Sequence, residues 1–181
     1  ALAKDFLQAG LLDRAEEALA KLEGGRYEAQ ARLARLAIYE RTRDWVQAGQ
    51  MAQQLQASGQ GDFNVRMAHY LCEQAKDLQA GPQRSLLIQA RDLSPQAGRA
   101  YMALADLAIE QGQPDEALQH LLGALNHAPA SAPLVAERLS SLAETAEQIR
   151  DVSLRLQSVY GQTRSIDVLQ ALARLTAQAN G

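Results

Sequence analysis

A spacing of about 34 residues between similar segments constrains this chain more than any other feature of its sequence. Three alanines, Ala15, Ala48 and Ala117, each follow a short turn and an acidic residue and precede apolar residues at helical spacing. They are separated by 33 and 69 residues, which is one and two periods. A repeat of this length predicts helical hairpins that stack on copies of themselves.

The clearest repeat covers residues 98–131. Its first helix has apolar residues at the i, i+3, i+4 and i+7 spacing of one helix face. Gly112 and Pro114 favour a turn and the start of a second helix, which Pro129 ends. The unit resembles the tetratricopeptide repeat (TPR) consensus, with Tyr101 in the place of the usual tryptophan. The positions predicted to pack the two helices of the repeats together are Ala15, Leu36, Ala48, Cys72, Ala105, Ala117 and Pro129.

The same pattern predicts a single TPR array along the whole chain, an all-α superhelix (α-solenoid) of about five to six helix-turn-helix repeats with no sheet. The first repeat begins inside its first helix, which carries Ala3 and Phe6 and turns at Gly10, and the last repeat is partial. Neither end has the polar face of a natural cap, so we expect a fragment of a longer protein. The predicted repeats cover residues 1–26, 27–61, 62–97, 98–131, 132–161 and 162–181.

Apolar spacing and turn residues also predict the individual helices. A turn is expected at Ala80–Gly81–Pro82, between the two helices of the third repeat. The second helix of the first repeat is expected to end near Glu23. The later helices are predicted over residues 27–42, 45–57, 64–79, 83–93, 132–145, 147–160 and 164–179.

The composition supports a helical chain. Apolar residues make up 47% of the sequence and aromatic residues only 4%, so most apolar residues are alanine and leucine, which favour helices. The net charge is −3 and no basic run is present, which argues against a nucleic-acid-binding protein. The longest uncharged run, Leu121–Ala136, contains two prolines and is not expected to span a membrane.

Cys72 is the only cysteine, and it lies three residues after His69. On a helix this spacing places both side chains within about one turn, as in some zinc sites. A zinc site needs three or four ligands, however, and no others converge on this pair. Cys72 falls on a packing position, where a free cysteine behaves as a small apolar residue. We therefore expect no metal site and no cofactor in this chain.

Side chains at the groove-facing positions of the first helices form the candidate binding site. In stacked helix pairs this groove binds peptides or protein surfaces, although each charged residue could also be only a solvated one. Ala37 and Glu40 face the same way as these residues. The candidate groove residues are Leu33, Arg41, Arg66, His69, Glu73, Lys76, Arg99, Met102 and Asp106.

Arg66 and Arg99 are 33 residues apart and are predicted to be neighbours in adjacent repeats, as are His69 and Met102. We expect reversal of both arginine charges to weaken partner binding with little effect on melting, because exposed substitutions usually cost little stability. Arg91 and Glu116 are predicted on the opposite, convex surface, where charge reversal should have little effect.

The sequence carries no recognisable catalytic motif. It contains no glycine-rich phosphate loop, no Gly-x-Ser-x-Gly and no His-Glu-x-x-His. His120 and His127 stand singly, and Trp45 at a helix start is predicted to pack. Asp115 and Glu116 complement the dipole of the helix that they begin. The chain is therefore predicted not to be an enzyme, and no catalytic residue is assigned.

Residues 3–75 carry a closer resemblance. The segments AGLLDRAE, IYE followed by DW, and AHYLCE occur there in order. In order and spacing they are similar to the lipopolysaccharide assembly protein B family of Gram-negative bacteria. The remainder of the chain resembles that family mainly as a repeat pattern.

The resemblance implies a protein on the cytoplasmic face of the inner membrane, anchored by an N-terminal helix that this chain lacks. It also implies a rubredoxin-like metal domain with paired Cys-x-x-Cys motifs after the repeats, and this chain has no such motif. Family members act as adaptors that promote degradation of the deacetylase LpxC by the membrane protease FtsH, and so restrain lipopolysaccharide synthesis. The implied partners are these two proteins and other lipopolysaccharide assembly proteins, without nucleic acid or direct membrane contact, and a homodimer stays open.

The leading prediction is thus a non-catalytic scaffold or adaptor that regulates lipopolysaccharide biosynthesis. A TPR module of another envelope or secretion assembly is the alternative from the same structural class. An enzyme is a third reading, which the absence of catalytic motifs disfavours.

Overall fold

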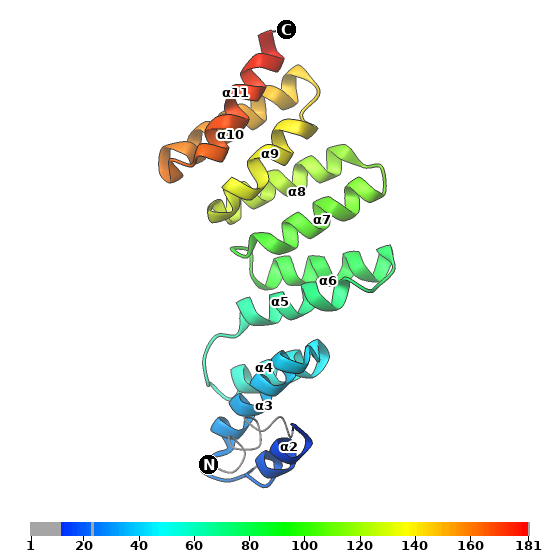
Figure 1. The fold of residues 1–181 in the computed structure, drawn as a ribbon, viewed down its shortest axis with the longest axis vertical. Coiled ribbons are helices and arrows are strands. Elements are labelled where there is room, and N and C mark those ends of the chain that lie inside the picture. The colour runs from blue at the N-terminus through cyan, green and yellow to red at the C-terminus, as the bar shows by residue number, and fades with distance from the viewer. Residues whose placement is uncertain (1–11, 23, 181) are drawn as a thin grey trace. The chain divides into compact units, whose positions relative to one another are not determined.

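The computed structural model describes residues 12–22 and 24–180. Within these ranges the chain forms ten α-helices and one 3₁₀ turn, and it contains no strand (Figure 1). The helices are α2 (Leu12–Ala20), α3 (Glu28–Thr42), α4 (Trp45–Ala57), α5 (Asn64–Ala75), α6 (Ala80–Leu93), α7 (Gly98–Glu110), α8 (Pro114–His127), α9 (Ala132–Leu142), α10 (Ala146–Thr163) and α11 (Ile166–Asn180), with η1 (Pro129–Ser131) between α8 and α9. The all-α fold class is confirmed.

Most predicted helices agree with the structure to within a few residues, and the third repeat holds the main difference. α5 ends at Ala75, earlier than predicted, and Ala80–Gly81–Pro82 forms the first turn of α6 instead of a loop. Proline is compatible with this position because the N–H groups of a first helical turn have no acceptor inside the helix. The helix predicted around Ala3 and Phe6 and the turn at Gly10 lie outside the described residues.

Two helix junctions show how local sequence sets the turns. α3 is followed by Arg43 in the left-handed conformation with a φ of 59°. The carboxylate of Asp44 then caps α4 by accepting a hydrogen bond from the backbone N–H of Gln47 at 3.1 Å. Between α7 and α8, Gly112 has a φ of 69°, which glycine adopts without strain, and Pro114 begins α8. Each junction lets two successive helices pack on each other.

The chain forms two compact units, residues 1–74 and 75–181, which are described separately. In the first unit α2 packs on α3, and α3 packs on α4. The contact between α2 and α3 buries Ala15, Leu19, Ala31 and Ile38. A second cluster joins α3 and α4 to Phe63 and to the side chains of α5. Its buried members are Leu36, Tyr39, Ala48, Met51, Ala52, Leu55, Phe63 and Tyr70.

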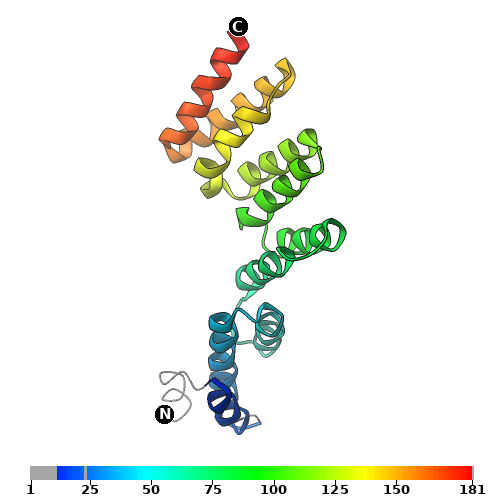
Figure 2. The same ribbon diagram turned by 45° about the vertical axis from the view of Figure 1, so that its right-hand side comes forward.

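In the second unit the helices stack in chain order. α6 packs on α7, α7 on α8 and α8 on α9, while α11 packs on both α9 and α10 (Figure 2). One continuous apolar core runs from α7 to α11, and α8, α9, α10 and α11 each contribute a fully buried leucine to it. These are Leu121, Leu139, Leu156 and Leu175. The core of this unit is thus shared along the stack, as expected for repeat proteins.

The predicted packing positions are buried with one exception. Five of them have no exposed surface and Cys72 is 5% exposed. Pro129 differs, because it is exposed at the start of η1, just after α8. Its ring restricts the backbone where the helix stops and does not fill the core. The five fully buried positions are Ala15, Leu36, Ala48, Ala105 and Ala117.

Tyr101 and Gly123 form a close helix–helix approach that depends on a missing side chain. A Cβ atom added to Gly123 would lie 2.9 Å from Cε1 and 3.0 Å from Cδ1 of Tyr101. The Tyr101 ring is 6% exposed and stacks on His127, with ring centroids 6.0 Å apart. The absence of a side chain at Gly123 therefore makes room for the tyrosine in the core of its repeat.

We expect Gly123→Ala to lower the free energy of unfolding by up to about 2 kcal/mol. The added methyl group forces the buried Tyr101 ring to shift, and overpacking typically costs about 1–3 kcal/mol. The gain of about 1 kcal/mol when alanine replaces glycine in a helix offsets only part of this cost. Urea denaturation followed by circular dichroism measures the difference.

Gly161→Ala in α10 is the matched control, because no atom lies within 4 Å of the position of its added Cβ. It should raise the free energy of unfolding by about 0.5–1 kcal/mol. Equal stabilisation by both substitutions would contradict the close approach of Gly123 and Tyr101.

Candidate functional site

The first helices of the predicted repeats carry the candidate binding residues except Lys76, which lies in the turn just after α5. These helices are α3 and α5 in the first unit and α7, α9 and α11 in the second, and we call their exposed side the first-helix face. Exposed candidates are Leu33, Arg41, Lys76 and Asp106. Half-buried candidates are Arg66, His69, Glu73, Arg99 and Met102. None of the nine is fully buried, although Met102 packs against the core of the second unit.

The nine residues divide between the two units. Five of them belong to the first unit, and Lys76, Arg99, Met102 and Asp106 belong to the second. The predicted proximity of Arg66 to Arg99 joins residues of different units and therefore stays a prediction. The same holds for His69 and Met102.

In the first unit, Glu40 of α3 is the centre of a polar network on this face. Arg66 of α5 donates from Nε to Glu40 Oε1 at 3.1 Å, and its Nη2 lies 2.7 Å from Glu40 Oε2. The hydroxyl of Tyr70, also on α5, donates to Glu40 Oε1. This paired geometry is the one that arginine and carboxylate groups form most strongly, and it ties the first helices of two successive repeats together.

The network changes the ionisation of its members. Burial on its own would raise the pKa of Glu40, but the hydrogen bonds from Arg66 and Tyr70 outweigh it, and the pKa is lowered. Burial and the hydrogen bond to Glu40 raise the pKa of Tyr70 to about 12. Glu40 is therefore charged and Tyr70 neutral at physiological pH, which is the combination that the hydrogen bond between them requires.

Aromatic rings extend this network towards α4. Trp45 stacks on Tyr70 with ring centroids 5.9 Å apart, and it meets His69 edge to face at 5.4 Å. The side-chain amide of Gln74 donates to the backbone carbonyl of Trp45 at 3.0 Å. Trp45 is half-buried against the core cluster of the first unit, so its predicted packing role agrees with the structure.

These contacts correct the expectation that charge reversal at Arg66 would have little effect on melting. Its guanidinium pairs with Glu40 and lies 5.5 Å from the centre of the Phe63 ring. A glutamate at position 66 would place two carboxylates beside each other and remove a donor from Glu40. Reversal of this charge would thus affect stability as well as binding, because the neighbouring groups are partly desolvated.

In the second unit, ion pairs also join successive first helices. Arg138 of α9 pairs with Asp106 of α7, and Arg174 of α11 lies 3.1 Å from Glu137 of α9. Both pairs are substantially exposed, so each contributes little to stability. They matter more for the surface that a partner would meet, because the charges of Asp106, Arg138, Glu137 and Arg174 are already paired there.

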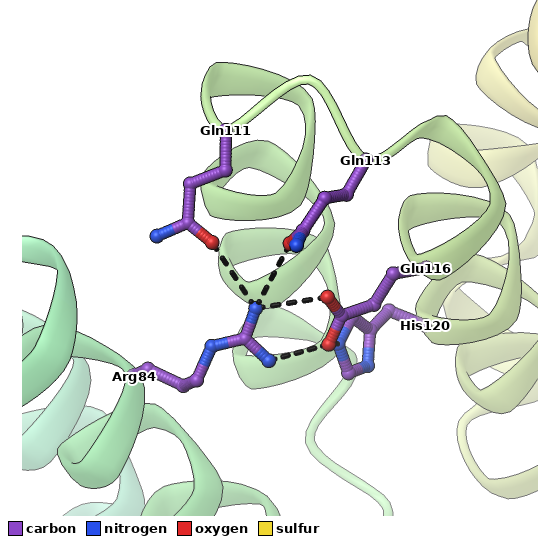
Figure 3. Close-up of polar contacts among 5 residues, drawn as sticks. All are labelled: Arg84, Gln111, Gln113, Glu116 and His120. Carbon is purple, nitrogen blue, oxygen red and sulfur yellow. Dashed lines mark hydrogen bonds and ion pairs between the residues drawn. The ribbon is translucent and has the colours of Figure 1, made fainter.

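The second helices, α6, α8 and α10, carry a further network on what we call the second-helix face. Arg84 of α6 donates to both carboxylate oxygens of Glu116 on α8, with Nη2 to Oε2 at 2.9 Å. Its Nη2 also donates to the side-chain carbonyls of Gln111 and Gln113, at 3.2 and 3.4 Å, in the turn between α7 and α8 (Figure 3). One side chain thus holds α6 to the turn and the second helix of the next repeat.

Charge reversal at Glu116 was predicted to have little effect, but this carboxylate has a structural partner in Arg84. The hydrogen bonds from Arg84 lower the pKa of Glu116 to about 2. His120 Nε2 lies 3.5 Å from Glu116 Oε1, and burial lowers the pKa of His120, which is therefore neutral at pH 7. Asp115 also has a structural partner, since Gln148 of α10 donates to its Oδ1 at 2.8 Å.

At least two clefts open on the described part of the second unit. One, of about 570 Å³, lies between α10 and α11 and includes Ile149, Leu175 and Ala179. The other, of about 240 Å³, lies between α8, η1 and α10, and we call it the second-helix cleft. It is lined by Leu125, Asn126, Pro129, Arg155, Ser158, Val159 and Gln162.

Among the residues that the structure describes, no group of three or more His, Cys, Asp or Glu side chains could hold a metal ion. Cys72 is buried, and as the only cysteine of the sequence it cannot form a disulfide within the chain. His69 lies in the aromatic contacts with Trp45 and Tyr70. In the same part of the chain, no helix has the length and apolar character that a membrane crossing requires.

Sequence reasoning missed Arg84, Arg138 and Arg174 as members of polar networks. A signal for two of them was present, because opposite charges recur at nearly one repeat period. Arg84 and Glu116 are 32 residues apart, as are Asp106 and Arg138. A search for such pairs along the sequence would have found both contacts.

Comparison with known proteins agrees with the repeat pattern. Residues 74–141 match the family described as tetratricopeptide repeat. The chain is 29% identical over 184 aligned residues to lipopolysaccharide assembly protein B of Haemophilus influenzae, with 99% of this chain and 46% of the relative covered. The predicted resemblance to that family and the TPR fold class are confirmed. The chain spans about half the length of this relative.

A similarity to a solved structure is weaker. It is to TTC0263, a thermophilic TPR protein of Thermus thermophilus, with 13% identity and a TM-score of 0.38 over 99% of this chain and 96% of that one. This similarity is too low to carry an argument.

We expect Glu40→Ala to lower the free energy of unfolding by about 1–3 kcal/mol, because it leaves the buried Tyr70 hydroxyl without its acceptor. Tyr70→Phe in the same background should recover part of the loss, since it removes the unpaired donor. Urea denaturation of the two single variants and the double variant measures the coupling.

The control is Glu110→Ala, which removes an exposed carboxylate on α7 and should change stability by less than about 0.5 kcal/mol. Additive effects of the two substitutions would contradict the hydrogen bond.

We expect the stabilising effect of Glu116 to depend on pH. Its pKa is lowered from 4.5 to about 2 in the folded chain, so its contribution is fully present above pH 4.5 and is lost as the pH falls towards 2. The Tm difference between the parent chain and Glu116→Gln should therefore be constant near neutral pH and shrink below pH 4.5. Arg84→Gln should abolish this pH dependence. A Tm difference that is unchanged down to about pH 3 would show that the pair does not form.

Proposed function

We propose that the chain is a non-catalytic scaffold that binds a partner protein through its first-helix face. The observation that carries this proposal is the distribution of side chains. Six of the seven predicted packing positions are buried, all but Pro129, whereas all nine candidate groove residues keep exposed surface. Stacked helix pairs with such a face are general platforms for peptides and protein surfaces.

We further propose that the partner belongs to the regulation of lipopolysaccharide biosynthesis. The similarity over 99% of this chain to a lipopolysaccharide assembly protein supports this assignment. The specific form of the proposal is an adaptor on the cytoplasmic face of the bacterial inner membrane. It would bring the deacetylase LpxC to the membrane protease FtsH and so promote turnover of the deacetylase.

The geometry of the first unit suggests how such a face would select its partner. Glu40, Arg66 and Tyr70 satisfy one another, so a partner gains little from a single opposing charge there. Leu33 is 42% exposed on the same helix as Glu40, and a partner that covers this leucine would remove apolar surface from water. We propose that partners bind by covering Leu33 and complementing the alternating charges around it, which favours specificity over affinity.

Leu33→Glu should therefore weaken binding of the purified deacetylase at least about tenfold, because it places a charge at the centre of the contact. Surface plasmon resonance with the 181-residue chain immobilised measures the dissociation constant. A second variant, Arg99→Ala, tests the first-helix face of the second unit in the same assay.

Val46→Glu is the matched control for Leu33→Glu. Val46 lies on α4, a second helix of the same repeat, and is 53% exposed. It should bind the deacetylase like the parent chain, and circular dichroism should show equal helix content in all variants. Loss of binding in Val46→Glu with normal binding in Leu33→Glu would place the partner on the exposed side of α4 instead. Absence of binding by the parent chain, with binding by another envelope protein, would refute the assignment to this deacetylase.

A further inference from the structure

The second-helix cleft combines an apolar floor with a polar rim. Leu125 of α8 and Val159 of α10 are buried in it, and Pro129 of η1 closes one side. Asn126 and Ser158 are two of the exposed polar residues along its edge, together with Gln162 and the half-buried Arg155. No acidic side chain lines the cleft among the residues that the structure describes.

Arg155 is held in place from both helices that border the cleft. Its Nε lies 3.0 and 3.1 Å from the two carboxylate oxygens of Asp151, one turn earlier on α10. Its Nη1 donates to Oδ1 of Asn126 on α8 at 3.3 Å. These contacts fix the plane of the guanidinium before any ligand arrives, which reduces the entropy that binding must overcome.

The remaining donors of the cleft have no partner within the described part of the chain. Arg155 Nη2 and Asn126 Nδ2 make no hydrogen bond there, and neither does the side chain of Ser158 or Gln162. The cleft thus offers a guanidinium edge, amide groups and a hydroxyl above a small apolar surface. A ligand that suits this set is a hydrogen-bond acceptor carried on a short aliphatic stem.

The size of the cleft limits what it can hold. Its volume of about 240 Å³ is below the range of about 300–1,000 Å³ that is usual for cofactor and small-molecule sites. A single amino-acid side chain fits such a space. Glutamate combines a two-carbon aliphatic stem with a carboxylate, so it can contact the floor and the donors at the same time.

We propose that the second-helix cleft binds a glutamate side chain in an acidic segment of a partner protein. This proposal rests on the protein-binding role proposed above and adds a contact on the opposite set of helices. The carboxylate accepts hydrogen bonds from Arg155 and Ser158, while its methylene groups cover Leu125 and Val159. Asp151 neutralises part of the charge of Arg155, so binding by one glutamate is weak and acts as a selective element of a larger contact.

The test is a titration of the ¹⁵N-labelled 181-residue chain with the peptide acetyl-Ala-Glu-Ala-amide, followed by NMR. The matched peptide acetyl-Ala-Gln-Ala-amide has the same shape without the charge. We expect the glutamate peptide to bind about tenfold more tightly, as is typical of a charge-assisted hydrogen bond. We also expect shifts in the signals of Asn126, of Arg155 Nε and of Ser158.

Ser158→Leu fills the cleft without touching the pair of Arg155 and Asp151, and it should weaken binding at least about tenfold. Gln157→Leu places the same side chain on the neighbouring exposed residue of α10, outside the cleft, and should bind like the parent chain. Equal affinity for the two peptides, shifts elsewhere than in the cleft, or full binding by Ser158→Leu would each overturn the proposal. None of these outcomes tests the first-helix face, because its variants are tested separately by their binding to the deacetylase.

Discussion

The structure depends on apolar contacts between helices that are neighbours in the stack, most of them consecutive in the chain. Leu121, Leu139, Leu156 and Leu175 come from four successive helices and share one core, so each helix is covered only by its neighbours in the stack. Ion pairs add contacts between helices one repeat apart, as between Arg84 of α6 and Glu116 of α8 or between Arg138 of α9 and Asp106 of α7. Stability in such an array is approximately a sum of neighbour interactions, and a change at one junction weakens two repeats together.

This arrangement also shapes recognition. Charges on the first-helix face of the first unit are already satisfied, since Glu40 accepts from both Arg66 and Tyr70. A partner that binds this surface must either complement the existing arrangement of charges or break an internal ion pair, which costs free energy. Polar surfaces of this kind discriminate between partners more than they attract them. Exposed apolar side chains such as Leu33 then supply the favourable part of the binding energy.

The fold was largely predictable from the sequence, because helix formation, turn residues and burial follow local patterns. Ala105 and Ala117 occupy predicted packing positions of the repeat and are both completely buried. Pro82 misled the prediction because proline is compatible with both a loop and a first helical turn. The sites were less predictable. The periodicity placed Arg66 on the right helix, but the choice of Glu40 as its partner depends on side-chain conformations that no linear spacing encodes.

Gly123 and Tyr101 bear on how far the repeats are modular. Their fit is local to one hairpin, since the ring on α7 occupies the space that a side chain on α8 would need. A helix exchanged between two repeats would have to bring its counterpart with it, or the ring and a methyl group would collide. Substitutions at the two positions are therefore coupled, since a side chain at position 123 fits better when the residue at position 101 is smaller than tyrosine. The repeats thus share one architecture, but their individual helices cannot simply be exchanged.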